Sequence, residues 1–170
     1  MTVAGFVHSR CSVNEPRWRL ATERDDAEII ALAVALYEED PSTAPVPPEH
    51  TQRTLAELRR APTRGRAVVL DAGRGPEGYA LLVSFWSNEL GGEVCTIDEI
   101  FVASARRGQG HAGRLMRAIG AGCELWPGIP AAMELEVSPK NRRARALYER
   151  LGFVEIRNAR LRQRSLEARG

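Results

Sequence analysis

The chain has 170 residues and a mass of 18.8 kDa, enough for one self-sufficient hydrophobic core and too little for two ordinary domains. Its composition, 44% apolar and 27% charged, is ordinary for a soluble globular protein, and no apolar run is long enough to cross a membrane. Residues 1–99 carry ten Arg against sixteen Asp and Glu, whereas residues 100–170 carry thirteen Arg and one Lys against six Glu. This uneven charge suggests a cationic partner for the first half and an anionic partner for the second.

The first half of the chain is predicted to form a strand and two helices after a flexible tail. The tail covers residues 1–16, which show no periodicity, and the alternation in residues 17–23 is typical of a strand. A stripe of apolar residues predicts a helix over residues 25–40, which ends at the proline that follows it. The proline-rich residues 41–48 are predicted to form a loop, and residues 49–60 a second helix.

The second half is predicted to alternate between strands and helices. Two apolar runs around a Gly-rich turn predict paired strands at residues 66–71 and 78–86, and the next strand, 94–103, carries two acidic residues. The remaining predicted elements are a helix at 110–126, a strand at 131–137, a helix at 141–152, and strands at 153–156 and 161–168. Together they predict a single α/β (α+β) domain over residues 17–168, with a mixed central sheet of about six to seven strands flanked by about four helices.

The cysteines and histidines are isolated from one another. Cys11, Cys95 and Cys123 are odd in number, and no Cys or His pair has the spacing of zinc ligands. We therefore expect neither a disulfide framework nor a metal site. The first residues also lack the basic and apolar segments of a secretory signal. These features together predict a cytoplasmic location without membrane association.

A Gly-rich junction between a strand and a helix carries the clearest chemical signal. Gly108, Gly110 and Gly113 let the backbone turn sharply and expose amide N–H groups at the start of the helix, which favours an anion such as phosphate. Arg106 and Arg107 add positive charge suited to a polyphosphate. The junction is not a P-loop, because it lacks GK[ST], and it lacks the GxGxxG spacing of a dinucleotide-binding fold.

The segment from Arg107 to Ala112 resembles the [RQ]-x-x-G-x-[GA] signature of the GCN5-related N-acetyltransferases. Further along the chain, residues 135–153 are similar to the second motif of that family, L-x-V-x-x-x-N-x-x-A-x-x-L-Y-x-x-x-G-F. The matching positions are Leu135, Val137, Asn141, Ala144, Leu147, Tyr148, Gly152 and Phe153. Both motifs occur in order on the expected elements, so the resemblance implies the fold of this family and the transfer of an acetyl group from acetyl-coenzyme A to an amine.

The resemblance implies a site for acetyl-coenzyme A and no metal ion. The loop amides would bind the pyrophosphate, and the free backbone groups of Ile100 and Val102 would pair with the pantetheine arm. Asn141 would cap its helix and contact the cofactor, and we expect His111 to face solvent or phosphate rather than to act as a base. The implied cofactor-binding residues are Ile100, Val102, Arg106, Arg107, Gly108, Gln109, Gly110, His111, Ala112, Gly113, Asn141 and Tyr148.

The reaction needs a base and an acid. An amine must be neutral to attack a thioester, so a carboxylate should accept its proton, directly or through water. Asp98 and Glu99 precede the loop, and strand alternation places their side chains on opposite faces, so that one of them faces the cleft; Glu99 is the favoured base. Tyr148 matches the tyrosine with which the family commonly protonates the departing thiolate, and a phenol pKa of about 10 suits a proton donor. Packing of Tyr148 on the apolar stripe of its helix is compatible with that role.

The acceptor site of this fold usually draws on the first two helices and on the strand before the phosphate loop. The residues that this implies are Tyr37, Glu38, Glu39, Asp40 and Trp86. Carboxylates beside aromatic rings suit a small cationic amine, through charge pairing and cation–π contact. A solvated helix end is the alternative interpretation of these acids, and a protein or peptide amino group is the alternative acceptor.

Two other functional classes are alternatives to an acetyltransferase. A nucleic-acid-binding module is disfavoured, because the arginines of the second half are not interleaved with aromatic residues and are interrupted by glutamates. A non-catalytic acyl-coenzyme A sensor on the same fold is the second alternative, and the presence of Glu99 and Tyr148 speaks against it. The resemblance also makes a homodimer possible.

Overall fold

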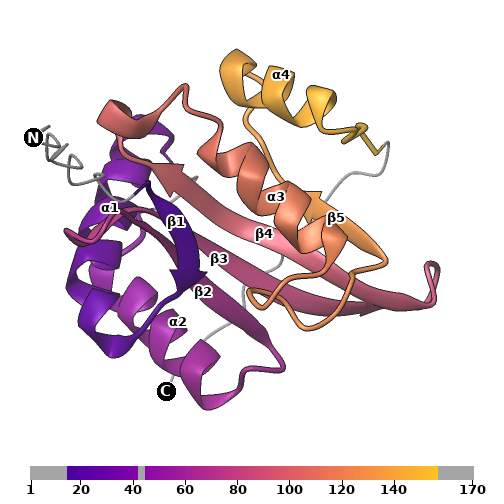
Figure 1. Ribbon diagram of the computed structural model, residues 1–170, viewed down its shortest axis with the longest axis horizontal. Coiled ribbons are helices and arrows are strands. Elements are labelled where there is room, and N and C mark those ends of the chain that lie inside the picture. The colour runs from indigo at the N-terminus through magenta and orange to yellow at the C-terminus, as the bar shows by residue number, and fades with distance from the viewer. Residues whose placement is uncertain (1–14, 42–44, 157–170) are drawn as a thin grey trace, which may run out of the picture. The chain divides into compact units, whose positions relative to one another are not determined.

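The computed structural model describes residues 15–41 and 45–156. The elements, in chain order, are β1 (Arg17–Leu20), the 3-10 helix η1 (Glu23–Asp25), α1 (Asp26–Glu39), α2 (Pro48–Arg60), β2 (Gly65–Asp71), β3 (Pro76–Ser87), β4 (Gly92–Val102), the 3-10 helix η2 (Ser104–Arg106), α3 (His111–Ala121), β5 (Ala132–Leu135) and α4 (Arg142–Arg150) (Figure 1). The chain forms two compact units, Met1–Ser138 and Pro139–Gly170, and α4 belongs to the second.

The strands form one mixed, five-stranded sheet in the order β1-β2-β3-β4-β5. The first four strands pair antiparallel, and β5 adds parallel to β4. The mixed α+β architecture confirms the predicted fold class, with fewer strands than expected among the described residues. Residues 153–156 form no strand, and the strand predicted at 161–168 lies outside the described residues.

The three helices of the first unit follow the predicted pattern, and their ends have local causes. The first strand is shorter than predicted because Thr22 and Asp25 form a capping box that starts η1. The third helix ends at Ala121 rather than at 126, because Gly122 adopts a φ of 79° that stops the helix. Most of the predicted tail, residues 1–14, and part of the proline-rich loop, residues 42–44, lie outside the described residues.

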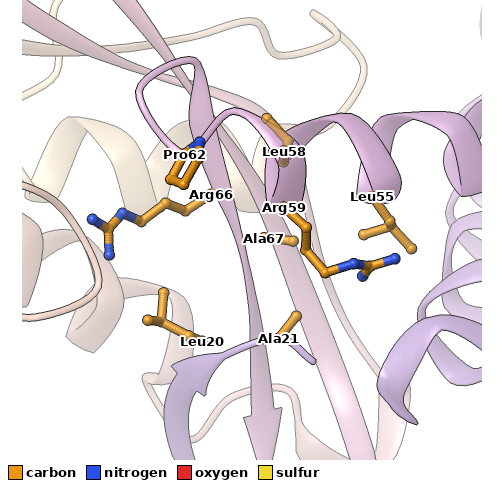
Figure 2. A pocket seen from close by; sticks show the side chains of 8 residues that line it. All are labelled: Leu20, Ala21, Leu55, Leu58, Arg59, Pro62, Arg66 and Ala67. Carbon is orange, nitrogen blue, oxygen red and sulfur yellow. The ribbon is translucent and has the colours of Figure 1, made fainter. Parts of the chain in front are cut away.

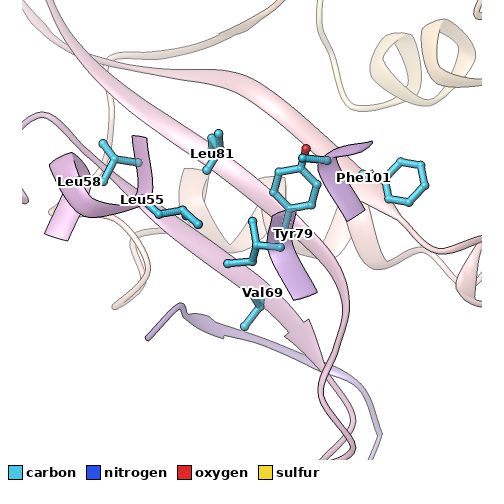
Figure 3. Close-up of a cluster of buried hydrophobic side chains, with 8 residues drawn as sticks. Leu55, Leu58, Val69, Tyr79, Leu81 and Phe101 are labelled. Carbon is cyan, nitrogen blue, oxygen red and sulfur yellow. The ribbon is translucent and has the colours of Figure 1, made fainter. Parts of the chain in front are cut away.

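Helices α1 and α2 cover one face of the sheet. The buried cluster on this face consists of Ile29, Ala33, Leu55, Leu58, Val69, Tyr79, Leu81 and Phe101 (Figure 3). Strand neighbours alternate between faces, so Tyr79 and Leu81 point to the same side of β3. Glu99 lies directly opposite Leu81 in the register of β3 and β4. This pairing places Glu99 on the face that α1 and α2 cover.

Helix α3 lies on the opposite face. Trp18 pairs with Leu70, the strand neighbour of Val69, and therefore points away from the α1–α2 cluster. Its indole Nε1–H donates to the backbone carbonyl of His111, the first residue of α3, at 2.9 Å. This bond fixes the start of α3 to the sheet, and Figure 1 shows α3 running along β4.

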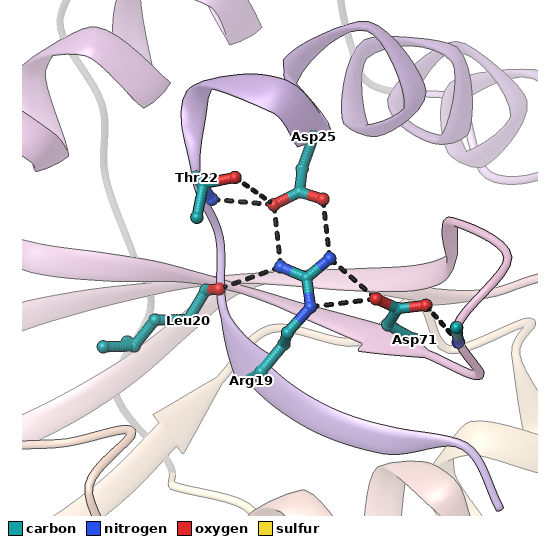
Figure 4. Close-up of polar contacts among 6 residues, drawn as sticks. Arg19, Leu20, Thr22, Asp25 and Asp71 are labelled. Atoms are coloured by element: carbon teal, nitrogen blue, oxygen red, sulfur yellow. Dashed lines mark hydrogen bonds and ion pairs between the residues drawn. The ribbon is translucent and has the colours of Figure 1, made fainter. Parts of the chain in front are cut away.

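A network of charged side chains anchors the start of α1. Arg19 of β1 donates Nη1 and Nη2 to the two carboxylate oxygens of Asp25, each at 2.8 Å, and also bonds Asp71 at the end of β2 (Figure 4). The hydrogen bonds from Arg19 hold the pKa of Asp25 down at about 2. Because Asp25 immediately precedes α1, this network sets where that helix begins.

A cavity of about 330 Å³ lies where α2 meets the ends of β1 and β2 (Figure 2). It is lined by Leu20, Ala21, Leu55, Leu58, Arg59, Pro62, Arg66 and Ala67. The cavity includes none of the predicted site residues. In the described part of the chain, no helix is long and apolar enough to cross a membrane, and no three or more His, Cys, Asp or Glu side chains gather as metal ligands would.

Candidate active site

The Gly-rich loop between β4 and α3 has the backbone geometry of an anion site. Gly108 has a φ of 82° and Gly110, the N-cap of α3, a φ of 77°, conformations that residues with a side chain rarely adopt. Residues 108–110 are exposed. A Cβ built on Gly110 would meet only the Nη1 atom of Arg114, 3.8 Å away, so the space over the helix start is open. The first amides of α3 have no intrahelical acceptor, and this cradle fits a pyrophosphate.

Two arginines at the loop are held by local partners. Arg106 makes a bidentate pair with Glu77 of β3, at 2.7 and 3.0 Å. Arg114 on α3 donates Nη1 to the carbonyl of Gln109 at 2.9 Å. Both bonds stiffen the loop, so its backbone amides, more than these side-chain charges, are the groups left to bind an anion.

Arg107 ties the loop to α1. Its Nε donates to the carbonyl of Val102 at 2.7 Å, and its Nη2 donates to Glu39 near the end of α1 at 2.8 Å. The guanidinium also lies 5.0 Å from the centroid of the Phe101 ring. The hydrogen bond from Arg107 holds the pKa of Glu39 below its usual value. Two residues predicted for different ligands, Arg107 for the cofactor and Glu39 for the acceptor, are therefore paired with each other.

His111 is buried under the loop rather than facing solvent, with 3% of its surface exposed. Its Nδ1 accepts a hydrogen bond from Arg114 at 2.7 Å, so Nε2 carries the proton and donates to Gln109 Oε1 at 3.2 Å. Burial and the charges of Arg114 and Arg106 lower the pKa of His111. The ring is therefore neutral and braces the loop from inside.

Strand β4 continues beyond the point where β5 leaves it. The pairing with β5 ends at Ile97, whereas β4 runs to Val102. On the other side, the N–H of Ala103 donates to Glu77 of β3 at 2.9 Å. Peptide groups alternate along an antiparallel ladder, so those of Ile100 and Val102 point away from β3. Among the described residues no strand pairs with this edge beyond Ile97, although the carbonyl of Val102 accepts from Arg107.

A bulge in β4 separates the two candidate bases. Leu81 pairs with Glu99 and the next residue, Leu82, pairs with Ile97, so Asp98 has no residue opposite it on β3. The bulge interrupts the simple alternation expected from the sequence. Asp98 is exposed, whereas Glu99 is half-buried among hydrogen-bond donors.

Glu99, Tyr37 and Tyr79 form what we call the base cluster. Tyr79 of β3 donates its hydroxyl to Glu99 Oε2 at 2.7 Å, and Tyr37 of α1 donates its hydroxyl to Oε1. Burial, followed by interactions with Glu99, raises the pKa of both phenols, and the charge of Asp98 adds to the effect. Both hydroxyls therefore keep their protons at neutral pH and remain donors to the carboxylate.

The other predicted acceptor residues do not all converge on the base cluster. Glu38 and Asp40 are exposed at the end of α1, directly after Tyr37. Trp86 is 63% exposed and lies five residues beyond Leu81 along β3, about 17 Å at the rise of a strand. Its side chain also points to the face opposite Tyr79. The structure thus brings Tyr37 to Glu99 and leaves Trp86 far from it.

In the second unit, α4 carries the second sequence motif. Asn141 caps this helix, because its Oδ1 accepts from the N–H of Ala144 at 3.1 Å, and Gly152 takes the left-handed conformation after it with a φ of 87°. Both features match the prediction. Tyr148 packs against the ring of Phe153, with centroids 5.7 Å apart. Burial raises the pKa of Tyr148, so its hydroxyl is protonated at neutral pH.

Neither Tyr79 nor the connection through Arg107 was predicted from the sequence. Tyr79 occurs in an apolar run that predicts only a strand, and nothing local shows that it lies two strand positions from the partner of Glu99. The signal that could have identified Tyr79 is its place on the same face of β3 as Leu81, the residue that pairs with Glu99. That signal requires the strand register.

Comparisons with known proteins agree with this fold. The model of the acetyltransferase (GNAT) family matches residues 27–153. A possible acetyltransferase from Clostridium difficile 630 has a TM-score of 0.74 at 20% identity, covering 89% of this chain and 99% of that one. An integron cassette protein from the mobile metagenome of Cole Harbour Salt Marsh has a TM-score of 0.69 at 26% identity, covering 88% and 91%.

A more specific structural relative is an aminoglycoside N-acetyltransferase in complex with coenzyme A. Its TM-score is 0.66 at 18% identity, with 89% of this chain and 95% of that one covered. At this identity the likeness shows a shared fold. No curated protein matches the sequence.

Proposed function

Because the family model spans residues 27–153, this chain belongs to the GNAT family of acetyltransferases and is an acyltransferase, and we propose that it transfers the acetyl group of acetyl-coenzyme A to the primary amine of a small cationic molecule. The observation that carries the proposal is the free edge of β4, which lies between the Gly-rich loop and Glu99. A donor bound along that edge would have its phosphates at α3 and its acyl end near the base cluster.

The residues of the donor side fit coenzyme A. The backbone amides of residues 108–112, of which residues 108–110 are exposed, would bind the pyrophosphate at the start of α3. The peptide groups of Ile100 and the N–H of Val102, whose carbonyl already accepts from Arg107, would hydrogen-bond the pantetheine arm as a further strand would. The bound donor supplies an acetyl thioester, and the chain positions it.

We assign the base to Glu99. The two tyrosine hydroxyls donate to it and so stabilise its charged form. Its carboxylate stands on the bulged part of β4, beside the free edge where the donor would bind. Asp98 is exposed at the bulge and contributes negative charge rather than a fixed proton acceptor.

We assign the acid to Tyr148 on the strength of the second motif. Its phenol keeps its proton at neutral pH because burial raises its pKa. It can therefore protonate the thiolate of the product, and Asn141 would contact the cofactor while capping the same helix.

The acceptor class follows from charge at the end of α1. Glu38, Glu39 and Asp40 stand together where the helix dipole is also negative, and the last turn carries no basic residue. Arg107 neutralises Glu39, which leaves Glu38 and Asp40 to attract a cation. Tyr37 connects this acidic helix end to Glu99.

The test is a coenzyme A release assay with acetyl-coenzyme A and a panel of polyamines, aminoglycosides, amino acids and peptides. Release that is fastest with small polycationic amines supports the proposal, and release that is fastest with peptides favours the protein amino-group alternative. Tight binding of coenzyme A without release for any acceptor would establish the sensor alternative.

The acceptor class has its own test in charge variants. Glu38→Gln with Asp40→Asn should raise the KM for the amine about threefold to tenfold, because partly screened surface charges each contribute about 1 kcal/mol or less. Glu89→Gln, an exposed acid in the turn after β3, is the matched control and should leave the KM unchanged. An unchanged KM in the double variant would contradict the assignment of this acidic helix end.

A further inference from the structure

Each oxygen of the Glu99 carboxylate already accepts a hydrogen bond. Tyr79 holds Oε2 and Tyr37 holds Oε1. Tyr79 is fully buried in the cluster under α1 and α2, so no substrate can reach its hydroxyl. Tyr37 on α1 and Glu99 are both half-buried, so Tyr37 is the hydrogen-bond donor of the base cluster whose side chain is not fully enclosed.

The position of Tyr37 on α1 directs an approaching amine to it. The residue directly precedes Glu38, Glu39 and Asp40, the exposed acidic end of the helix. Tyr37 is thus both the neighbour of this acidic helix end in the chain and the hydrogen-bond partner of Glu99. The bond between Arg107 and Glu39 fixes this end of α1 relative to the Gly-rich loop, so the hydroxyl is held in place with respect to the donor side.

We propose, building on the function proposed above, that Tyr37 is a catalytic residue that relays the proton of the amine to Glu99. As the amine nitrogen forms a bond to the thioester carbon, its proton passes to Tyr37 Oη while the hydroxyl proton of Tyr37 passes to Glu99 Oε1. The C–S bond then breaks, and the sulfur takes the proton of Tyr148.

The proton balance closes after each turnover. Tyr37 ends the step as a neutral phenol, Glu99 as a carboxylic acid and Tyr148 as a phenolate. Loss of the Glu99 proton to solvent and uptake of one proton by Tyr148 restore the starting state. The raised pKa of Tyr37 suits this role, because the relay exchanges its proton without ever needing a free phenolate.

Two matched variants of the full chain test the relay. Tyr37→Phe removes the relaying hydroxyl, and Tyr79→Phe removes the other donor to the same carboxylate, so each variant costs Glu99 one hydrogen bond. We expect Tyr37→Phe to lower kcat at least about tenfold, toward the roughly hundredfold contribution at the low end for positioned acid–base groups. The KM for acetyl-coenzyme A should stay unchanged, and Tyr79→Phe should lower kcat less.

Solvent isotope measurements give a readout that an anchoring role would not change. The rate is measured in mixtures of H2O and D2O, under conditions where chemistry limits it. For the wild type, a plot of the rate against the deuterium fraction should be curved, because two protons move in the same step. Tyr37→Phe should give a straight line. This comparison decides the question even if Tyr79→Phe fails to fold.

The opposite results overturn the relay. Equal losses of kcat in the two variants would mean that Tyr37 only anchors Glu99. A rise in kcat or a fall in the KM for the amine in Tyr37→Phe would mean that Tyr37 blocks Glu99 until the amine displaces it. A straight line for the wild type would exclude a two-proton step. Failure of the proposed function looks different: there, no amine supports release of coenzyme A, or Glu99→Gln leaves the rate unchanged.

Discussion

The Gly-rich loop and the base cluster are built in opposite ways. The loop is assembled from neighbouring residues: Arg114 bonds Gln109 five positions away, and His111 bonds Gln109 two positions away. The base cluster joins residues that are 62 and 20 positions apart in the sequence. A site made from backbone conformation and a helix end is determined by residues that are close in the sequence. A site made from converging side chains depends on strand register and on helix docking.

The two regions should therefore fail in different ways. The loop works through amides and positive-φ glycines, so it should be sensitive to an added Cβ and tolerant of many side-chain changes. The base cluster works through three oxygen-bearing side chains, so the loss of a single polar atom should be costly. Arg107 and Glu39 connect the two regions physically.

The largest effect is expected when the base cluster loses its charge. Glu99→Gln should lower kcat by about a hundredfold or more, because the amine proton loses its acceptor. The affinity for coenzyme A should stay the same, because the loop is unaffected. Steady-state release assays and calorimetric binding measure the two quantities. Asp98→Asn is the control at the bulge, and an equal loss there would show that Glu99 is not the specific base.

A smaller effect is expected when the anchor of α1 is removed. Asp25→Asn should lower the free energy of unfolding by about 2 kcal/mol, because Asp25 loses the charge that the Arg19 hydrogen bonds stabilise and the capping box is weakened. Since α1 carries Tyr37, this variant also shows how much the base cluster depends on helix docking. Urea denaturation measures the loss.

The pH dependence of this anchor has a definite sign. The folded pKa of Asp25 is about 2, below its ordinary value of 3.8, so the carboxylate stabilises the fold above about pH 4 and this contribution is lost as the pH falls toward 2. Asp25→Asn should remove that part of the acid sensitivity. If the variant and the wild type lose stability in parallel between pH 5 and 2, the anchor is not Asp25.

The loop should respond more weakly, and only in binding. Gly110→Ala forces a side chain into a left-handed conformation at a cost of about 1–2 kcal/mol, so the Kd for coenzyme A should rise about tenfold. Gly128→Ala is the matched control, because Gly128 has a similar φ of 81° and open space around it, away from the loop. If both variants bind coenzyme A equally well, the amides over α3 are not the phosphate site.

The smallest effect is expected from His111. Its folded pKa lies below the ordinary value of 6.5, so the unfolded chain binds its proton first, and stability should fall as the pH drops below about 6.5. His111→Gln, which retains an acceptor for Arg114, should flatten this part of the stability profile. Thermal melts between pH 7.5 and 5.5 measure it, and a variant profile that follows the wild type would exclude His111 as its source.

The local features of the fold could be read from the sequence. The stripe of apolar residues placed α1, Pro41 placed its end, the glycines placed the start of α3 although not its end at Ala121, and the cap at Asn141 followed from residue type. The Gly-rich junction indicated an anion site because backbone amides at a helix start need no distant partner. These elements are determined by interactions within a few residues.

The remaining features depend on contacts between distant segments. The burial of His111 follows from Trp18 and from the packing of α3 on the sheet, which no local pattern encodes. The bulge at Asp98 arises from a register shift between β3 and β4, and it leaves Asp98 without a partner on β3 while Glu99 stays paired with Leu81. Trp86 was assigned to the acceptor site on its residue type, and its place along β3 separates it from Glu99.

The central claim is that the loop serves the donor and the base cluster serves the acceptor, so one experiment should separate the two. The Kd for coenzyme A and kcat at saturating acetyl-coenzyme A are measured together for wild type, Glu99→Gln and Gly110→Ala. We predict that Glu99→Gln binds coenzyme A as the wild type does but turns over at least about a hundredfold more slowly, and that Gly110→Ala binds about tenfold more weakly but keeps the wild-type kcat. Loss of both binding and turnover to the same extent in either variant would contradict the account.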